Sequence, residues 1–272
     1  MTLHSRIRQQ LIGSLAQVQS DEACQLNNAL RLLSKWRSVL IQDRFLQEQG
    51  TVVLEGPLEG LDFLSRSTEG CHIAKLLGCY EQPLHPFIEA AIQASYPVVL
   101  NIGCAEGYYA VGMARRMSAT RMLAFDHNPK AQRACAEVAE KNSVSDRVTV
   151  GALFKVEDFA TCAGDAERLL VICDIEGGER DLLDPAAAPD LARMDLIVEC
   201  HERLVPGITK LLTDRFAPTH DITRVSDDGQ RQLRNAPAWF MNLPQLDQLL
   251  AVWEWRGGPT PWLVMKAKPA DT

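Results

Sequence analysis

The chain has 272 residues, of which 46% are hydrophobic and 23% are charged, and its formal net charge is −7. This composition is ordinary for a folded protein, and the length allows one α/β domain of about 170 to 180 residues plus an additional segment. The acidic balance argues against nucleic acid as the main partner, because proteins that bind its phosphates usually carry a basic face. The first twenty residues contain no continuous apolar core, and no stretch approaches about 18 uninterrupted apolar residues, so we expect neither secretion nor membrane insertion.

The eight cysteines are dispersed and include no C-x-x-C pair. Several fall inside predicted strands or helices, where a free cysteine behaves as a small apolar side chain. We therefore expect reduced cysteines in a cytoplasmic protein, without a disulfide framework or a zinc site.

Apolar residues recur at helical spacing near the N-terminus and predict two amphipathic helices. The first covers residues 3–18, and the second covers residues 21–40 behind Ser20 as a candidate N-cap. Because two helices cannot bury both apolar stripes alone, we expect them to pack on the following domain as a lid. Glycines break the pattern across residues 49–78, which predicts an irregular connection with a short strand at residues 52–54.

Strands and helices alternate beyond this connection, which predicts an α/β domain with a doubly wound, mostly parallel sheet. After Pro218 the pattern changes and fits a closing antiparallel pair at the sheet edge. We predict two domains, a helical extension of residues 1–78 and an α/β domain of residues 79–272. The predicted strands are 98–103, 121–126, 147–153, 168–174, 195–200, 222–225 and 262–268, and the predicted helices are 83–95, 107–117, 129–142, 178–184, 207–216 and 244–253.

The most informative stretch is the strand, turn and helix opening across residues 98–107. The turn contains Gly103 and Ala105, and a second apolar strand ends at Asp126. Glycine lets the backbone approach a ligand closely, and an acid at the tip of the second strand can accept hydrogen bonds from both ribose hydroxyls. The third glycine of a dinucleotide-binding turn is replaced here by Tyr108. The stretch therefore predicts a nucleoside-binding unit of another kind.

Polar residues follow the two strands expected beside this unit. Asp174 and Glu176 come after one of them, and Glu199 and His201 come at the end of the other. Ligands of open α/β sheets bind at the carboxyl ends of the strands, so these side chains are expected to converge next to the turn.

The acids of these stretches receive different interpretations. We expect Glu179 and Glu202 to be solvated charges on a helix or loop. Asp174 follows an apolar run, where a carboxylate needs a specific reason to be present. His201 fits a catalytic base as well as a hydrogen-bonded structural histidine.

The chain resembles class I S-adenosylmethionine (SAM)-dependent methyltransferases, most nearly the FkbM-like O-methyltransferases, over residues 78–216. The resemblance implies a Rossmann-like fold, and the turn with small residues at 103, 105 and 107 fits SAM better than a dinucleotide. It also implies that the turn faces the methionine part of SAM, Asp126 its ribose, and the Asp174 loop its methionine end and the acceptor. The matching segments are Gly78-Cys79-Tyr80-Glu81, Asn101-Ile102-Gly103-Cys104-Ala105-Glu106-Gly107, Ala124-Phe125-Asp126, Asp174-Ile175-Glu176-Gly177-Gly178-Glu179 and Leu196-Ile197-Val198-Glu199-Cys200-His201.

The resemblance implies that the chain is a methyltransferase that acts on a small-molecule hydroxyl, with SAM as its cofactor. His201 or Glu176 would be the base, with Glu199 as a third catalytic candidate. We expect no metal, although Asp174, Glu199 and His201 could hold magnesium. No nucleic-acid or membrane partner is expected, and a homodimer stays open. The predicted cofactor-binding residues are Tyr80, Asn101, Gly103, Ala105, Gly107, Asp126, His127 and Asp174.

Two positions and one segment depart from the family pattern. Asn101 stands where an acid is usual, Ala105 stands where a glycine is usual, and residues 151–154 offer mainly apolar walls for the adenine. An amide at Asn101 can hydrogen-bond the methionine ammonium, but it does not stabilise its charge.

Two other functions stay open, the first of them because of the amide at Asn101. In the first, an uncharged methionine amine attacks its own side chain and releases methylthioadenosine, with Tyr80, Tyr108 and Tyr109 holding the sulfonium. In the second, the chain is a non-catalytic cofactor-binding or scaffold module built around the N-terminal helices.

Overall fold

The computed structural model describes residues 2–16, 21–67, 70–164, 166 and 168–269. Its centre is one seven-stranded sheet. The strands are β1 (Val98–Ile102), β2 (Arg121–Phe125), β3 (Val148–Gly151), β4 (Leu169–Cys173), β5 (Asp195–Glu199), β6 (His220–Val225) and β7 (Trp262–Ala267). Their order is β3-β2-β1-β4-β5-β7-β6, and β7 runs antiparallel to both β5 and β6, whereas the other neighbouring pairs are parallel. This order confirms the predicted doubly wound sheet with an antiparallel pair at one edge.

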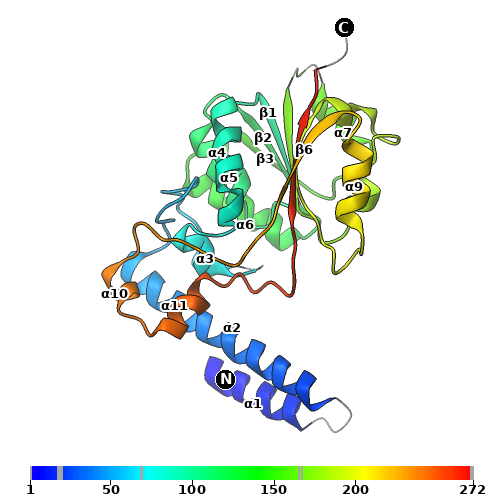
Figure 1. Cartoon of the computed structure of the whole chain (residues 1–272). Helices are drawn as coiled ribbons and strands as arrows, with labels where there is room; N and C mark the ends of the chain where they lie inside the picture. The colour runs from blue at the N-terminus through cyan, green and yellow to red at the C-terminus, as the bar shows by residue number, and fades with distance from the viewer. Residues whose placement is uncertain (1, 17–20, 68–69, 165, 167, 270–272) are drawn as a thin grey trace.

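Helices cover both faces of the sheet (Figure 1). Alternate residues of β1 contribute to different cores, because successive side chains of a strand point to opposite faces. Val99 belongs to the core beneath α4, α5 and α6, and Leu100 belongs to the core beneath α7 and α9. These helices are α4 (His85–Ala94), α5 (Tyr108–Arg116), α6 (Pro129–Lys141), α7 (Asp158–Ala163) and α9 (Ile208–Phe216).

The remaining helices lie at the ends of the chain or between strands. Several differ from the sequence predictions. The second N-terminal helix is longer than predicted, and a six-residue helix stands in the region predicted to be irregular. The predicted strand at residues 52–54 is reduced to one isolated bridge between Val52 and Asp62. The elements are α1 (Leu3–Leu15), α2 (Glu22–Gln49), α3 (His72–Leu77), η1 (Gln82–Leu84), α8 (Glu179–Leu182), η2 (Pro189–Arg193), α10 (Ala238–Met241) and α11 (Gln245–Val252).

The missed helices have a simple physical explanation. Every residue of α3 is buried, so the helix shows no polar face and no amphipathic period. The six residues of α7 are too few to display a 3.6-residue repeat. The long α2 continues to Gly50, whose positive φ of 74° ends the helix.

The two N-terminal helices project from the sheet domain (Figure 1). Helix α1 has no buried residue and packs against α2. The second half of α2 packs against α11 and α3. Its Ile41 and Phe45 are buried in the core that lies beneath α4, α5 and α6. The same core contains Leu61 and Phe63, which precede the predicted domain boundary at residue 78.

We predict that substitutions of buried and of exposed side chains of α2 differ strongly in their effect on the free energy of unfolding. Phe45→Ala should lower the free energy of unfolding by about 3 to 5 kcal/mol, because Phe45 is fully buried. Leu30→Ala on the same helix should change it by less than about 0.5 kcal/mol, because Leu30 is 64% exposed. Urea denaturation of the two variants checks this, and equal losses would contradict the placement of α2.

All eight cysteines are free, and all except Cys24 are buried. Among the described residues, no helix combines the length and the apolar character needed to cross a membrane.

Candidate active site

Two adjoining cavities lie at the carboxyl ends of the parallel strands. This edge includes the point between β1 and β4 where the strand order reverses, which is the usual ligand position in such sheets. The first cavity, of about 560 Å³, is lined by the turn after β1, the end of β2 and the loop after β4. The second, of about 550 Å³, is lined by the end of β5, Tyr80 and part of the segment 254–260. Both cavities include Gly70, Asp174 and Glu176 in their walls.

Gly103 is the residue on which the turn after β1 depends. Its φ is +78°, and a Cβ there would lie 1.6 Å from the backbone oxygen of Asp174. Its N–H donates to the carbonyl oxygen of Phe125 at 2.8 Å. Only glycine fits a position that combines a left-handed φ with such a close backbone approach.

Asp126 connects the end of β2 to this turn. Its Oδ2 accepts a hydrogen bond from the N–H of Ala105 at 3.0 Å, and its Oδ1 accepts one from the N–H of Asn128 at 2.8 Å. The residue is 6% exposed and lines the first cavity. A carboxylate has about four acceptor positions, so lone pairs remain for a ligand.

Most predicted cofactor-binding residues lie at these cavities. Gly103, Ala105, Asp126, His127 and Asp174 line the first cavity, and Tyr80 lines the second. The apolar wall predicted after the third strand is present, since Leu153 and Phe154 also line the first cavity.

Asn101 and Gly107 are in the walls of neither cavity. Asn101 is 2% exposed within β1, where its Nδ2 donates to the carbonyl oxygen of Ile172 at 3.5 Å. Its Oδ1 has no hydrogen-bond partner among the described residues. A Cβ at Gly107 would lie 2.7 Å from Sγ of Cys135, so this glycine allows α5 and α6 to pack. The roles of both residues toward a ligand stay predictions.

The predicted convergence of carboxylates and an imidazole is present, because β4 and β5 are paired. The His201 side chain is 7% exposed, and its Nε2 lies 3.4 Å from Oδ1 of Asp174. The same Nε2 lies 3.5 Å from Oε2 of Glu176 and 3.7 Å from Oε2 of Glu199. One ligand atom from each of Asp174, Glu176 and His201 lies within 4.8 Å of the others, so these three residues could hold a metal ion.

The prediction that Glu179 is a solvated charge is wrong. Its side chain is fully buried, and its Oε1 lies 2.8 Å from Nδ1 of His201. The four-residue helix α8 turns this carboxylate inward, and so short a helix has no sequence period that could indicate it. Glu202 is half-buried, and it accepts hydrogen bonds from the N–H groups of Gly207 and Thr209 at the start of α9.

Burial and the crowding of acids govern the ionisation of Asp174 and His201. Burial, together with the charges of Glu199 and Glu81, raises the pKa of Asp174 well above its ordinary value. Burial by itself lowers the pKa of His201, but the hydrogen bond to Glu179 and the charge of Glu199 outweigh it and raise this pKa. The crowded acids therefore favour the protonated forms of Asp174 and His201.

Arg256 is a neighbour that sequence reasoning missed. Its guanidinium donates to Glu81 at 2.6 Å, to Glu254 at 3.0 Å and to Glu199. Burial and the charge of Glu199 raise the pKa of Glu81 to about 8, although Arg256 opposes the shift. Glu81 and Glu199 are distant from Arg256 in the sequence, and no local pattern indicates their contact.

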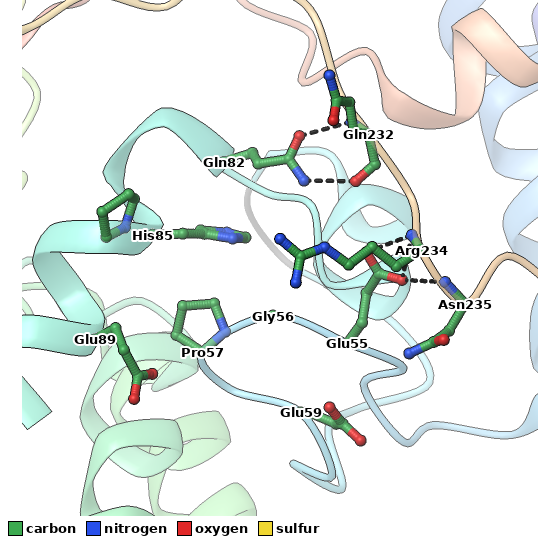
Figure 2. A pocket seen from close by; sticks show the side chains of 11 residues that line it. Glu55, Gly56, Pro57, Glu59, Gln82, His85, Glu89, Gln232, Arg234 and Asn235 are labelled. Carbon is green, nitrogen blue, oxygen red and sulfur yellow. Dashed lines mark hydrogen bonds between the residues drawn. The ribbon is translucent and has the colours of Figure 1, made fainter.

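A further cavity of about 610 Å³ lies away from the glycine turn (Figure 2). It is lined by parts of the segment 55–59, the start of α4 and the segment 232–235. Figure 2 shows the Glu55 carboxylate accepting hydrogen bonds from the N–H groups of Arg234 and Asn235. Glu55 therefore connects two chain segments, and no group of converging catalytic side chains distinguishes this cavity.

No protein-family model matches the sequence, and no curated protein matches it. The solved structures to which the chain is similar have low sequence identity to it. An O-methyltransferase from Bacillus cereus in complex with SAH is 16% identical, with a TM-score of 0.48 over 69% of this chain and 81% of that chain. The O-methyltransferase TomG from Streptomyces achromogenes, in complex with SAM, is 13% identical, with a TM-score of 0.45 over 99% of this chain and 100% of that chain.

A human methyltransferase 10 domain containing protein is 11% identical, with a TM-score of 0.46 over 86% of this chain and 96% of that chain. The strand order and the flanking helices of this chain are those of the predicted doubly wound, Rossmann-like sheet with an N-terminal helical extension.

Proposed function

We propose that the chain is a SAM-dependent methyltransferase that acts on a small-molecule hydroxyl, in the FkbM-like branch of the O-methyltransferases. The observation that carries the proposal is the pair of adjoining cavities with Asp174 and Glu176 in both walls. One cavity is built on a glycine turn with an acid at the tip of the next strand, which suits a nucleoside. The other cavity leaves room for an acceptor beside it.

SAM would occupy the first cavity. Its ribose hydroxyls would donate to Asp126, and its adenine would contact Leu153 and Phe154. The methionine end would point toward Asp174, so that the methyl group reaches the second cavity.

Methyl transfer is an in-line displacement in which the bond from sulfur to the methyl carbon breaks as the bond to the acceptor oxygen forms. The protein must align the two molecules, exclude water and allow the hydroxyl proton to leave. His201, Glu176 and Glu199 line the second cavity, which supports a role for one of them in accepting that proton. Helix α2 contributes Lys35 to the same wall, which supports a covering role for the N-terminal helices.

The test is incubation with SAM carrying an isotopically labelled methyl group and with a metabolite extract, followed by mass spectrometry. We expect S-adenosylhomocysteine and one labelled, methylated metabolite. Release of methylthioadenosine without acceptor would instead identify the self-cyclising enzyme, and binding without any product would identify a scaffold.

His201→Ala should lower the rate of this transfer by roughly 100-fold or more, because the acceptor loses the group that faces it from β5. Its affinity for S-adenosylhomocysteine should change little, since His201 is outside the wall of the first cavity. Glu202→Gln is the matched control, because the neighbouring Glu202 is outside both walls. Equal rates for the two variants would remove His201 from the proposed site.

A further inference from the structure

We infer that Asp174, Glu176 and His201 form a binding site for a divalent metal ion at the junction of the two cavities. Their ligand atoms lie within 4.8 Å of one another. The three residues come from the loops after β4 and β5, so paired strands hold the site together. Ion binding itself does not depend on the proposed function, and only the use of the ion rests on it.

The first support is the way in which His201 is held. Its side chain is 7% exposed, and its Nδ1 hydrogen-bonds to the fully buried Glu179 carboxylate at 2.8 Å. An ionised carboxylate can only accept, so Nδ1 carries a proton, and in the neutral imidazole Nε2 is the atom that can bind a metal ion. Carboxylates commonly orient metal-binding histidines in this manner. Within the described part of the chain, Nε2 makes no hydrogen bond and faces the acids.

The second support is the orphaned Oδ1 of Asp174. This oxygen is buried and has no hydrogen-bond partner among the described residues. It lies 3.4 Å from Nε2 of His201, and Oε2 of Glu176 lies 3.5 Å from the same nitrogen. Both separations exceed the usual 2.7 to 3.2 Å of a hydrogen bond from nitrogen to oxygen. They match the distance of about 3.4 Å between two ligands of a tetrahedral ion with bonds of about 2.1 Å.

The third support is the excess of negative charge. Glu199 adds a third carboxylate 3.7 Å from Nε2 of His201. Arg256 is bound to Glu199, but it is also bound to Glu81 and Glu254. Converging acids are unfavourable unless a positive charge lies between them. A divalent cation would supply that charge.

The donor set indicates the kind of ion. One imidazole with carboxylates suits a first-row ion such as Mn²⁺ or Zn²⁺ better than Ca²⁺ or Mg²⁺, which prefer oxygen ligands alone. Given the proposed function, the ion would bind the acceptor oxygen in the second cavity and lower its pKa. The hydroxyl proton would then pass to solvent, and His201 and Glu176 would act as ligands rather than as bases.

The experiment is calorimetric titration of chelator-treated protein with MnCl₂ and with ZnCl₂, without any nucleoside present. We expect one equivalent of ion to bind. Asp174→Asn and His201→Ala should each abolish binding or weaken it beyond the roughly 10- to 100-fold loss expected for an outer residue. Glu179→Gln should show that intermediate loss, because Glu179 positions His201 without touching the ion. Glu202→Gln should bind as the native protein does.

Thermal unfolding of each metal-free variant identifies any that fail to fold. The remaining variants still show whether these residues bind the ion. Absence of binding by the native protein, or equal binding by all variants, would overturn the inference and indicate a protonated His201 paired with the acids. S-adenosylhomocysteine binding is measured separately in the presence of EDTA. Nucleoside binding and undiminished methyl transfer in EDTA, without metal binding, would contradict the metal site but not the proposed function. Metal binding without nucleoside binding would contradict the proposed function but not the metal site.

Discussion

Gly103→Ala should lower the free energy of unfolding by about 2 to 5 kcal/mol and abolish binding of S-adenosylhomocysteine. The added Cβ would lie 1.6 Å from the backbone oxygen of Asp174 and 2.7 Å from its carbonyl carbon. The clash is with backbone, so no side-chain rotation relieves it. Separating β1 from β4 would relieve it, but this would break the hydrogen bond from the Asp174 N–H to the Ile102 oxygen.

Gly207→Ala is the matched control for this substitution. Gly207 has a similar φ of +83°, but a Cβ there would meet no atom within 4 Å. The control therefore carries only the left-handed backbone strain of about 1 to 2 kcal/mol. Urea denaturation and calorimetric titration of both proteins make the comparison. Equal destabilisation by the two substitutions, or intact nucleoside binding by Gly103→Ala, would contradict the geometry of the turn.

Asp126→Ala should weaken binding of S-adenosylhomocysteine by about 10- to 150-fold, equivalent to about 1.5 to 3 kcal/mol. The substitution removes the acceptor proposed for the ribose hydroxyls, and it also removes the hydrogen bond that orders the N–H of Ala105. Both effects act on the first cavity. Calorimetric titration measures the loss directly.

His127→Ala tests whether this loss is specific to Asp126. His127 also lines the first cavity, but its side chain is 82% exposed at the rim. We expect its substitution to change the affinity by less than about threefold, because a solvated side chain contributes little to binding. An unchanged affinity in a folded Asp126→Ala protein would contradict the proposed placement of the nucleoside in the first cavity. Tighter binding of NAD than of S-adenosylhomocysteine would lead to the same conclusion.

Local sequence pattern predicted the elements that position the site. The apolar runs of β1, β2, β4 and β5 each end within one residue of the predicted limit, because a buried strand is visible as a short apolar run. The positions of Gly103 and Asp126 followed from the same pattern, since a strand ending in a small-residue turn needs no distant information. The pairing of β4 with β5 followed from the usual strand order of such sheets.

Contacts between distant residues could not be predicted in this way. The Glu179 carboxylate reaches His201 across 22 positions of the sequence, and Arg256 reaches Glu199 and Glu81 across 57 and 175 positions. Asn101 shows the same limit, because the sequence placed it near a ligand and the structure buries its side chain outside both cavity walls.

The sequence by itself thus determined the doubly wound sheet, the glycine turn and the strand ends from which the acids project, because each depends on spacing along one segment. Only the tertiary structure decided that Glu179 turns inward to hold His201 and that Asp174 and Glu176 border both cavities. The physical reason is that hydrogen bonding and burial of a charged side chain depend on the surfaces brought against it. Those surfaces come from loops and helices whose packing no local repeat encodes.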